Sequence, residues 1–181
     1  MRAACLLLAC VLANAASAGE PISFAAQGSV QLAFTPGDDA AGLVVDAIHG
    51  AKKQVLVQAY SFTHRDIAEA LVDAKRRGLD VRVVADREQT GKMENGRIAW
   101  IAGHGVPVWL DADHSAAHDK VMVIDAGTHD ATVITGSFNF THAAQSRNAE
   151  NLLVLRGNLN LVEAYAANWR RHRAHSLAWR P

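Results

Sequence analysis

The chain has 181 residues, a length that suits one domain with a sizeable core. Hydrophobic residues make up 50% of the chain and charged residues 20%, a composition that excludes a disordered or fibrous protein. Lysine plus arginine and aspartate plus glutamate number 18 each, so the overall charge gives no electrostatic argument for binding nucleic acid.

The first 18 residues are typical of a cleavable signal peptide. Met1-Arg2 gives a positive start, residues 5–13 form a short apolar run, and Ala16-Ser17-Ala18 supplies the small residues that signal peptidase requires. We therefore expect cleavage after Ala18 and a mature chain, residues 19–181, that is periplasmic or secreted. The apolar run is too short to remain as a stable membrane anchor. A lipoprotein signal that ends at Cys10 is the alternative.

Both cysteines, Cys5 and Cys10, lie within the predicted signal peptide. The mature protein then has no thiol, which excludes disulfides, cysteine nucleophiles and cysteine metal ligands. Packing alone has to stabilise the fold.

After a leader at residues 19–27, short apolar segments alternate with helical patterns. In chain order these patterns predict a strand at residues 29–34, a helix at 40–51, a strand at 54–60, a helix at 66–77, a strand at 80–86, a short helix at 98–102, a strand at 106–110, paired strands at 120–125 and 131–135, a strand at 151–155 and a helix at 159–172. Strands interleaved with helices favour a layered α/β sandwich, and the absence of an interdomain linker favours one domain.

The residues that can carry chemistry lie between positions 118 and 151. They comprise His118-Asp119-Lys120, then Gly136-Ser137-Phe138-Asn139, then Glu150-Asn151. Side chains alternate along a strand, so His118 and Lys120 are expected on one face and Asp125 on the other. A lysine and the neutral donors Ser137 and Asn139 suit the oxygens of a phosphate.

A neutral imidazole is a competent nucleophile towards phosphorus when a partner holds its other nitrogen. Glu150 is the natural partner for His118. The lysine and the amide already supply the charge stabilisation, so the chemistry requires no metal and no cofactor.

The pattern His-x-Lys, four residues and Asp, then Gly-Ser-x-Asn and Glu-Asn resembles the signature of the phospholipase D superfamily. The resemblance continues through residues 58–63 and 74–78 to the closing helix, and within the superfamily it points to the small bacterial endonucleases that resist EDTA. It implies an α/β/α sandwich with a mixed central sheet over residues 19–181.

The resemblance also implies roles for individual residues. His118 would form a phosphohistidine intermediate, Lys120 and Asn139 would bind phosphate oxygens with Ser137 nearby, and Glu150 would orient the imidazole. The aspartate of the family signature corresponds to Asp125, to which we assign a structural role because alternation places it off the catalytic face.

Larger members of the superfamily carry two copies of the motif, whereas this chain carries one. One histidine has to attack and another has to protonate the leaving oxygen. We therefore expect a homodimer with a shared site, in which a second subunit supplies the other histidine.

These observations predict a secreted, metal-independent endonuclease that cleaves DNA or RNA. The first alternative is a phospholipase D that hydrolyses lipid headgroups with the same machinery. The second is a nucleic-acid-binding module without turnover.

Other histidines and basic clusters have simpler interpretations. His114 lies four residues before His118, but no nearby carboxylate completes a known zinc pattern, so it is interpreted as a loop residue. A contact between His142 and substrate is left open. Lys75-Arg76-Arg77 and Arg170-Arg171-His172-Arg173 complement helix dipoles or contact phosphates. The remaining histidines are expected mostly in solvent: His49, His64, His104, His129, His172 and His175.

Overall fold

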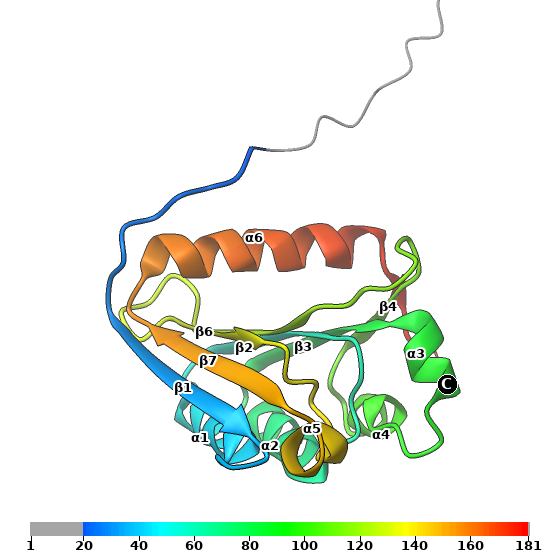
Figure 1. The fold of residues 1–181 in the computed structure, drawn as a ribbon. Coiled ribbons are helices and arrows are strands. Elements are labelled where there is room, and N and C mark those ends of the chain that lie inside the picture. The colour runs from blue at the N-terminus through cyan, green and yellow to red at the C-terminus, as the bar shows by residue number, and fades with distance from the viewer. Residues whose placement is uncertain (1–19, 181) are drawn as a thin grey trace, which may run out of the picture.

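A computed structural model of the chain describes residues 20–180. The predicted signal peptide lies outside the described residues. Together the described residues form a single α/β domain around one eight-stranded sheet (Figure 1). Its elements in chain order are β1 (Ser29–Thr35), α1 (Ala40–Gly50), β2 (Gln54–Ala59), α2 (Arg65–Arg76), β3 (Asp80–Asp86), α3 (Arg87–Lys92), α4 (Ile98–Gly103), β4 (Val108–Asp111), β5 (Lys120–Ile124), β6 (Thr132–Gly136), α5 (His142–Ser146), β7 (Glu150–Arg156), α6 (Leu159–His175) and β8 (Leu177–Ala178).

The sheet is mixed and open, with the strand order β1-β7-β6-β5-β2-β3-β4-β8. β2, β3 and β4 run parallel, while the pairs β2–β5, β5–β6, β6–β7, β1–β7 and β4–β8 are antiparallel. The crossovers through α2 and α4 follow from the parallel strands, because parallel neighbours need a long return connection.

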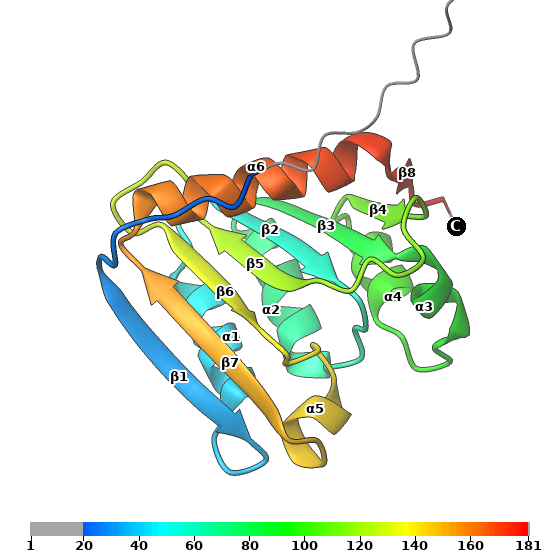
Figure 2. The ribbon, with the colours of Figure 1, turned by 45° about the horizontal axis from the view of Figure 1, so that its top comes forward.

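Two helical layers cover the sheet, which confirms the predicted α/β/α sandwich. Figures 1 and 2 show α6 across one face and α1, α2, α4 and α5 on the other. Alternation along each strand divides the core accordingly: Met122 and Ile124 belong to the larger cluster with α1 and α2, whereas Val121 and Val123 pack with α6. The face of α6 that contacts the sheet presents Val162, Ala166 and Trp169 at helical spacing.

Among the described residues, α6 packs mainly on β2 to β6, and of β7 it is Leu155 that packs against the cluster beneath this helix, so the outer strand β1 is the least covered on that face. The side chains of Val30, Leu32 and Phe34 on β1 are accordingly 51–58% exposed. Leu153 and Leu155 of β7 lie opposite Leu32 and Val30 in the register and are half-buried. We call these five side chains the β1/β7 apolar face.

All the predicted elements are present, with ends shifted by no more than three residues. The structure adds the short elements α3, α5 and β8, which were not predicted; unlike the short α4, the helices α3 and α5 lack a run of apolar residues that would mark them in the sequence. α3 and α5 begin with side-chain caps, since Asp86 accepts from the Gln89 amide and Thr141 from the Ala144 amide.

Candidate active site

The topology brings the motif residues other than Asp125 to one end of the central strands. Strand direction places the end of β2, the start of β5, the end of β6 and the start of β7 side by side. His118 and Lys120 enter at the start of β5, Ser137 leaves β6, and Glu150 opens β7. We call this the catalytic edge. His118 and Glu150, which are 32 positions apart in the sequence, are therefore brought to the same end of the sheet by strand pairing alone.

His118 and Lys120 are in direct contact. The Lys120 Nζ lies 2.8 Å from His118 Nδ1 and donates to the His118 carbonyl at 2.5 Å. The His118 ring is exposed and rests on Tyr60, with ring centroids 4.3 Å apart, while the Lys120 ammonium lies 5.0 Å from the same Tyr60 ring. Tyr60 therefore supports both groups. This role could not be predicted from the sequence, because a tyrosine at a strand end is also compatible with packing.

Lys120 is 7% exposed. Burial lowers the pKa of its ammonium, although the carboxylates of Asp119 and Glu150 act in the opposite direction. The lysine is thus a desolvated cation, which interacts more strongly with a phosphate than a solvated one does.

Ser137 and Asn151 connect β6 to β7 beside this pair. The Ser137 hydroxyl accepts from the Asn151 amide at 3.0 Å and from the Asn151 side chain at 3.3 Å. Gly136 has φ +143°, and a Cβ there would lie 2.3 Å from the Asn151 carbonyl oxygen. Only glycine permits this approach, so the Gly-Ser pair fixes where Ser137 points.

Asn139 lies beyond this turn and lines a cleft of about 410 Å³ that it shares with Ser61, Thr63 and His142. Its buried Oδ1 has no hydrogen-bond partner among residues 20–180. A buried amide oxygen without a partner is costly and typical of functional positions.

Glu150 does not contact the His118 ring in this arrangement. Its Oε1 accepts from the Asn148 side chain at 3.0 Å, and within the described chain no hydrogen bond joins it to His118. The negative charge of Glu150 nevertheless acts to raise the pKa of the Lys120 ammonium.

Asp125 lies at the far end of β5 from His118. Its Oδ2 accepts from the Lys52 amide at 2.8 Å, and its Oδ1 accepts from the Lys53 and Gln54 amides at 2.7 and 2.8 Å. The carboxylate thus satisfies the amides of the α1–β2 connection, away from the catalytic edge.

The prediction that the remaining histidines lie mostly in solvent is wrong for His64. It is 5% exposed and stacks on His142, with 4.3 Å between the ring centroids. Burial is the main cause that lowers the pKa of His64, and the neighbouring His142 lowers it further. His142 itself accepts from the Arg65 amide at 3.4 Å.

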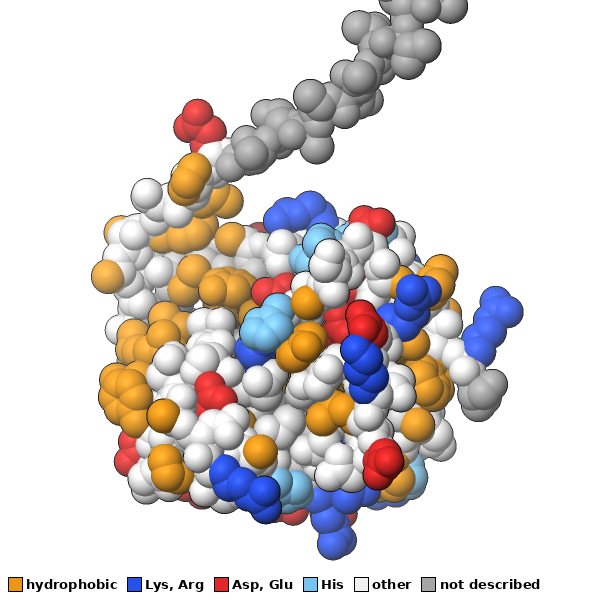
Figure 3. Space-filling model, turned by 45° about the vertical axis from the view of Figure 1, so that its right-hand side comes forward, with side chains coloured by type: hydrophobic (Ala, Val, Ile, Leu, Met, Phe, Trp, Pro, Cys, Tyr) orange, Lys and Arg blue, Asp and Glu red, His pale blue; other side chains and the backbone are white. Residues whose placement is uncertain are grey.

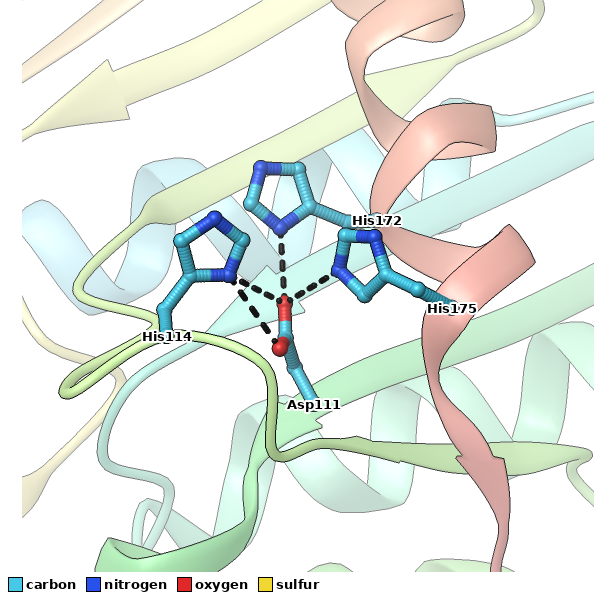
Figure 4. Close-up of side chains that lie close together, drawn as sticks. All are labelled: Asp111, His114, His172 and His175. Carbon is cyan, nitrogen blue, oxygen red and sulfur yellow. Dashed lines mark hydrogen bonds and ion pairs between the residues drawn. The ribbon is translucent and has the colours of Figure 1, made fainter. Parts of the chain in front are cut away.

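His114 lies in the loop after β4, as expected, but the premise that no carboxylate lies near it is wrong. His114, His172 and His175 surround the buried Asp111 at the end of β4 (Figure 4). Both His172 and His175 were expected in solvent; His175 is exposed, whereas His172 is half-buried. The long sequence separation between β4 and the end of α6 hid this arrangement.

The two basic clusters lie at opposite edges. α2 runs back from the catalytic edge, so Lys75-Arg76-Arg77 is remote from it, with Arg77 donating to the Ile48 carbonyl at 3.0 Å. α6 returns to the catalytic edge, where Arg173 lies 4.5 Å from the Trp109 ring centroid. Figure 3 shows Lys, Arg and His side chains spread over this side of the molecule, with Asp and Glu side chains among them.

The fold and this edge define a phosphodiesterase domain of the phospholipase D type. A sequence model of the family described as "Cardiolipin synthase, PLD-like domain" matches residues 44–173. The chain therefore belongs to the phospholipase D superfamily, and is a phosphodiesterase of that superfamily.

Comparison with individual proteins gives the same family. Nuc from Salmonella typhimurium, a phospholipase D family member of known structure, is 38% identical with a TM-score of 0.79 over 86% of this chain and 100% of that chain. The phospholipase D of Rickettsia bellii is 34% identical over 155 residues, 86% of this chain and 74% of that protein. NucT from Helicobacter pylori, at 24% identity and a TM-score of 0.74, shares the fold.

None of the helices within residues 20–180 combines the length and the apolar character that a membrane-spanning segment requires.

Proposed function

We propose that this chain is an exported endonuclease that hydrolyses DNA or RNA phosphodiesters through a phosphohistidine on His118, without a metal in the reaction. The observation that carries the proposal is the contact of His118 with the buried Lys120 ammonium at an exposed sheet edge. The similarity to Nuc over the whole of that chain supports nucleic acid as the substrate.

The contacts of the His118 ring determine how its tautomer has to change when substrate binds. A neutral His118 that accepts from the Lys120 ammonium at Nδ1 carries its proton on Nε2. Attack through Nε2 needs the other tautomer. We infer that an incoming phosphate draws Lys120 onto its oxygens and that Nδ1–H then donates to Glu150, which frees the Nε2 lone pair.

The remaining groups stabilise charge on the phosphate. Lys120 supplies the cation and Asn139 a neutral donor, with Ser137 beside them. Attack breaks the bond to one ester oxygen and gives a phosphoramidate, which water hydrolyses in the second step. Both steps need a second acid-base group opposite His118.

A second subunit supplies that group in our proposal, and the β1/β7 apolar face is the surface that would bind it. Phe34, at one end of this face, lies opposite Asn151 in the register, and Asn151 bonds Ser137. The apolar face is therefore continuous with the catalytic edge. An exposed apolar strip on an edge strand of a monomer is a liability that a two-fold partner removes.

The dimer has a matched test. Leu32→Asp places a charge within the β1/β7 apolar face, whereas Leu177→Asp changes a leucine of similar exposure on the opposite edge strand β8. Sedimentation should show a dimer for the wild type and Leu177→Asp, and a monomer with little activity for Leu32→Asp. A fully active monomeric wild type would contradict the shared site.

Phospholipase D activity is the second candidate, because relatives 34% identical to this chain carry that name. Purified protein should be incubated with plasmid DNA, with RNA and with phosphatidylcholine vesicles, and His118→Asn should serve as the inactive control. Nicking of nucleic acid without choline release supports the nuclease, and choline release alone supports the lipase. Binding of DNA without turnover supports the non-catalytic module.

Trapping the intermediate tests the mechanism. Rapid acid-free quenching during turnover of labelled DNA, followed by peptide mapping, should place the label on His118. EDTA should leave the rate intact at 25 °C. Complete loss of activity that a divalent ion restores would count against metal-independent chemistry.

A further inference from the structure

Four side chains from three segments converge beside the catalytic edge (Figure 4). Asp111 ends β4, His114 follows in the loop, and His172 and His175 lie at the end of α6. The Asp111 Oδ2 lies 2.7 Å from His172 Nδ1 and 3.1 Å from His175 Nε2, and both carboxylate oxygens lie 3.3 Å from His114 Nδ1.

We propose that Asp111, His114, His172 and His175 bind one divalent transition-metal ion, with zinc as the best match. We call these four residues the Asp111 cluster. Three imidazole nitrogens and one carboxylate oxygen are ligands that zinc takes in tetrahedral sites. Calcium and magnesium prefer oxygen ligands and are therefore poor matches.

The geometry is close to what such an ion requires. One ligand atom from each residue can be chosen so that all four lie within 4.8 Å of one another. Tetrahedral bonds of about 2.0–2.1 Å separate ligand atoms by about 3.3 Å, so the cluster has to close by about 1.5 Å at its widest. The His114 and His175 side chains are 46% and 32% exposed, so both can turn inward without disturbing the core.

Outer contacts orient the two most buried ligands. The Asp113 amide donates to Asp111 Oδ1 at 3.1 Å, which leaves Oδ2 to face the histidines. With Nδ1 of His172 directed at Asp111, its Nε2 lies 3.7 Å from Asp119 Oδ2. Asp119 in turn accepts from Gln58 at 2.9 Å. A carboxylate behind a histidine ligand is a regular feature of metal sites.

Four protein ligands leave a tetrahedral ion no open position, so this ion is structural and takes no part in the reaction. It would connect the end of α6 to β4 and to the loop that leads to His118. Its binding is independent of the proposed nuclease activity, and the tests below do not use activity.

Metal content is the first test. Untagged wild-type protein, incubated with zinc sulfate and freed of excess ion, should retain about one zinc per chain by emission spectroscopy. His114→Ala/His175→Ala should retain almost none. This double variant keeps the 2.7 Å contact between Asp111 and His172, the most buried pair of the cluster. His49→Ala/His129→Ala removes two exposed histidines elsewhere and should retain the zinc.

Stability and spectroscopy give two independent readouts. Zinc at about a thousand times its Kd should raise the wild-type Tm by about 10 °C and leave the Tm of His114→Ala/His175→Ala unchanged. Cobalt(II) added to the metal-free wild type should give the intense visible bands of four-coordinate cobalt, a readout that needs no variant.

Equal zinc in the wild type and in His114→Ala/His175→Ala, or cobalt spectra of the hydrated ion, would overturn the proposal. Either result would leave a cluster of hydrogen bonds around Asp111. A protein that binds zinc and fails to cleave nucleic acid would refute the proposed function alone.

Discussion

Substitution of Asp125 tests whether this residue of the phospholipase D signature has a structural or a catalytic role. It is 2% exposed, and its two oxygens accept from three backbone amides. Asp125→Asn preserves the shape of the side chain and removes one acceptor oxygen. If the amide oxygen stays with Lys53 and Gln54, the new NH2 group faces the Lys52 amide, donor against donor.

The cost follows from these contacts. The unpaired Lys52 amide costs about 1–3 kcal/mol, and loss of charge weakens the two remaining hydrogen bonds by about 1 kcal/mol in total. Turning the amide over would oppose two backbone donors instead of one, so it offers no relief. We expect a loss of about 3 kcal/mol in the free energy of unfolding, which lowers the Tm of a chain of this size by about 6–12 °C.

Catalysis should survive the same change. Asp125 lies five residues along the strand from Lys120, roughly 17 Å away at the rise of an extended chain. The assays are urea unfolding and kcat/KM at 25 °C. Asp130→Asn, an exposed carboxylate paired with Lys52, is the control and should change neither. A hundredfold loss of kcat/KM in folded Asp125→Asn would refute the structural assignment.

The remaining predictions concern the catalytic edge. Lys120→Met should abolish activity yet raise the free energy of unfolding by about 0.5–2 kcal/mol, measured by thermal melts, because it removes a buried ammonium. Burial lowers the folded-state pKa of Lys120, so the charged form costs stability at neutral pH and that cost fades as the pH rises through the folded pKa towards 10.5. The stability gap between Lys120→Met and the wild type should therefore narrow at alkaline pH; a constant gap would contradict the assigned cause. Gly136→Ala should cost at least about 2 kcal/mol, measured in urea, because a Cβ meets the Asn151 carbonyl and φ is positive. Unchanged stability would show that the β6–β7 contact yields easily.

The sequence predicted the features that depend on local pattern. Alternation on β5 placed Met122 and Ile124 on one face, and the structure buries them together under α1 and α2. The motif spacing also anticipated that His118 and Lys120 meet. The expected contact between His118 and Glu150 is not formed in this arrangement. It depends on which tautomer the ring adopts, and Lys120 is a competing donor to the ring.

The Asp111 cluster could not be predicted from local sequence patterns. His172 lies 61 residues from Asp111, and the pair meets only because α6 crosses the sheet back to the edge where β4 ends. No spacing rule links the two segments. The same return of α6 brings His172 towards Asp119, the residue beside His118. A bound ion would therefore influence catalysis only by limiting the motion of the loop that carries His118. The loss of activity on removing the ion should grow with temperature, because the hydrogen bonds around Asp111 then hold that loop less firmly.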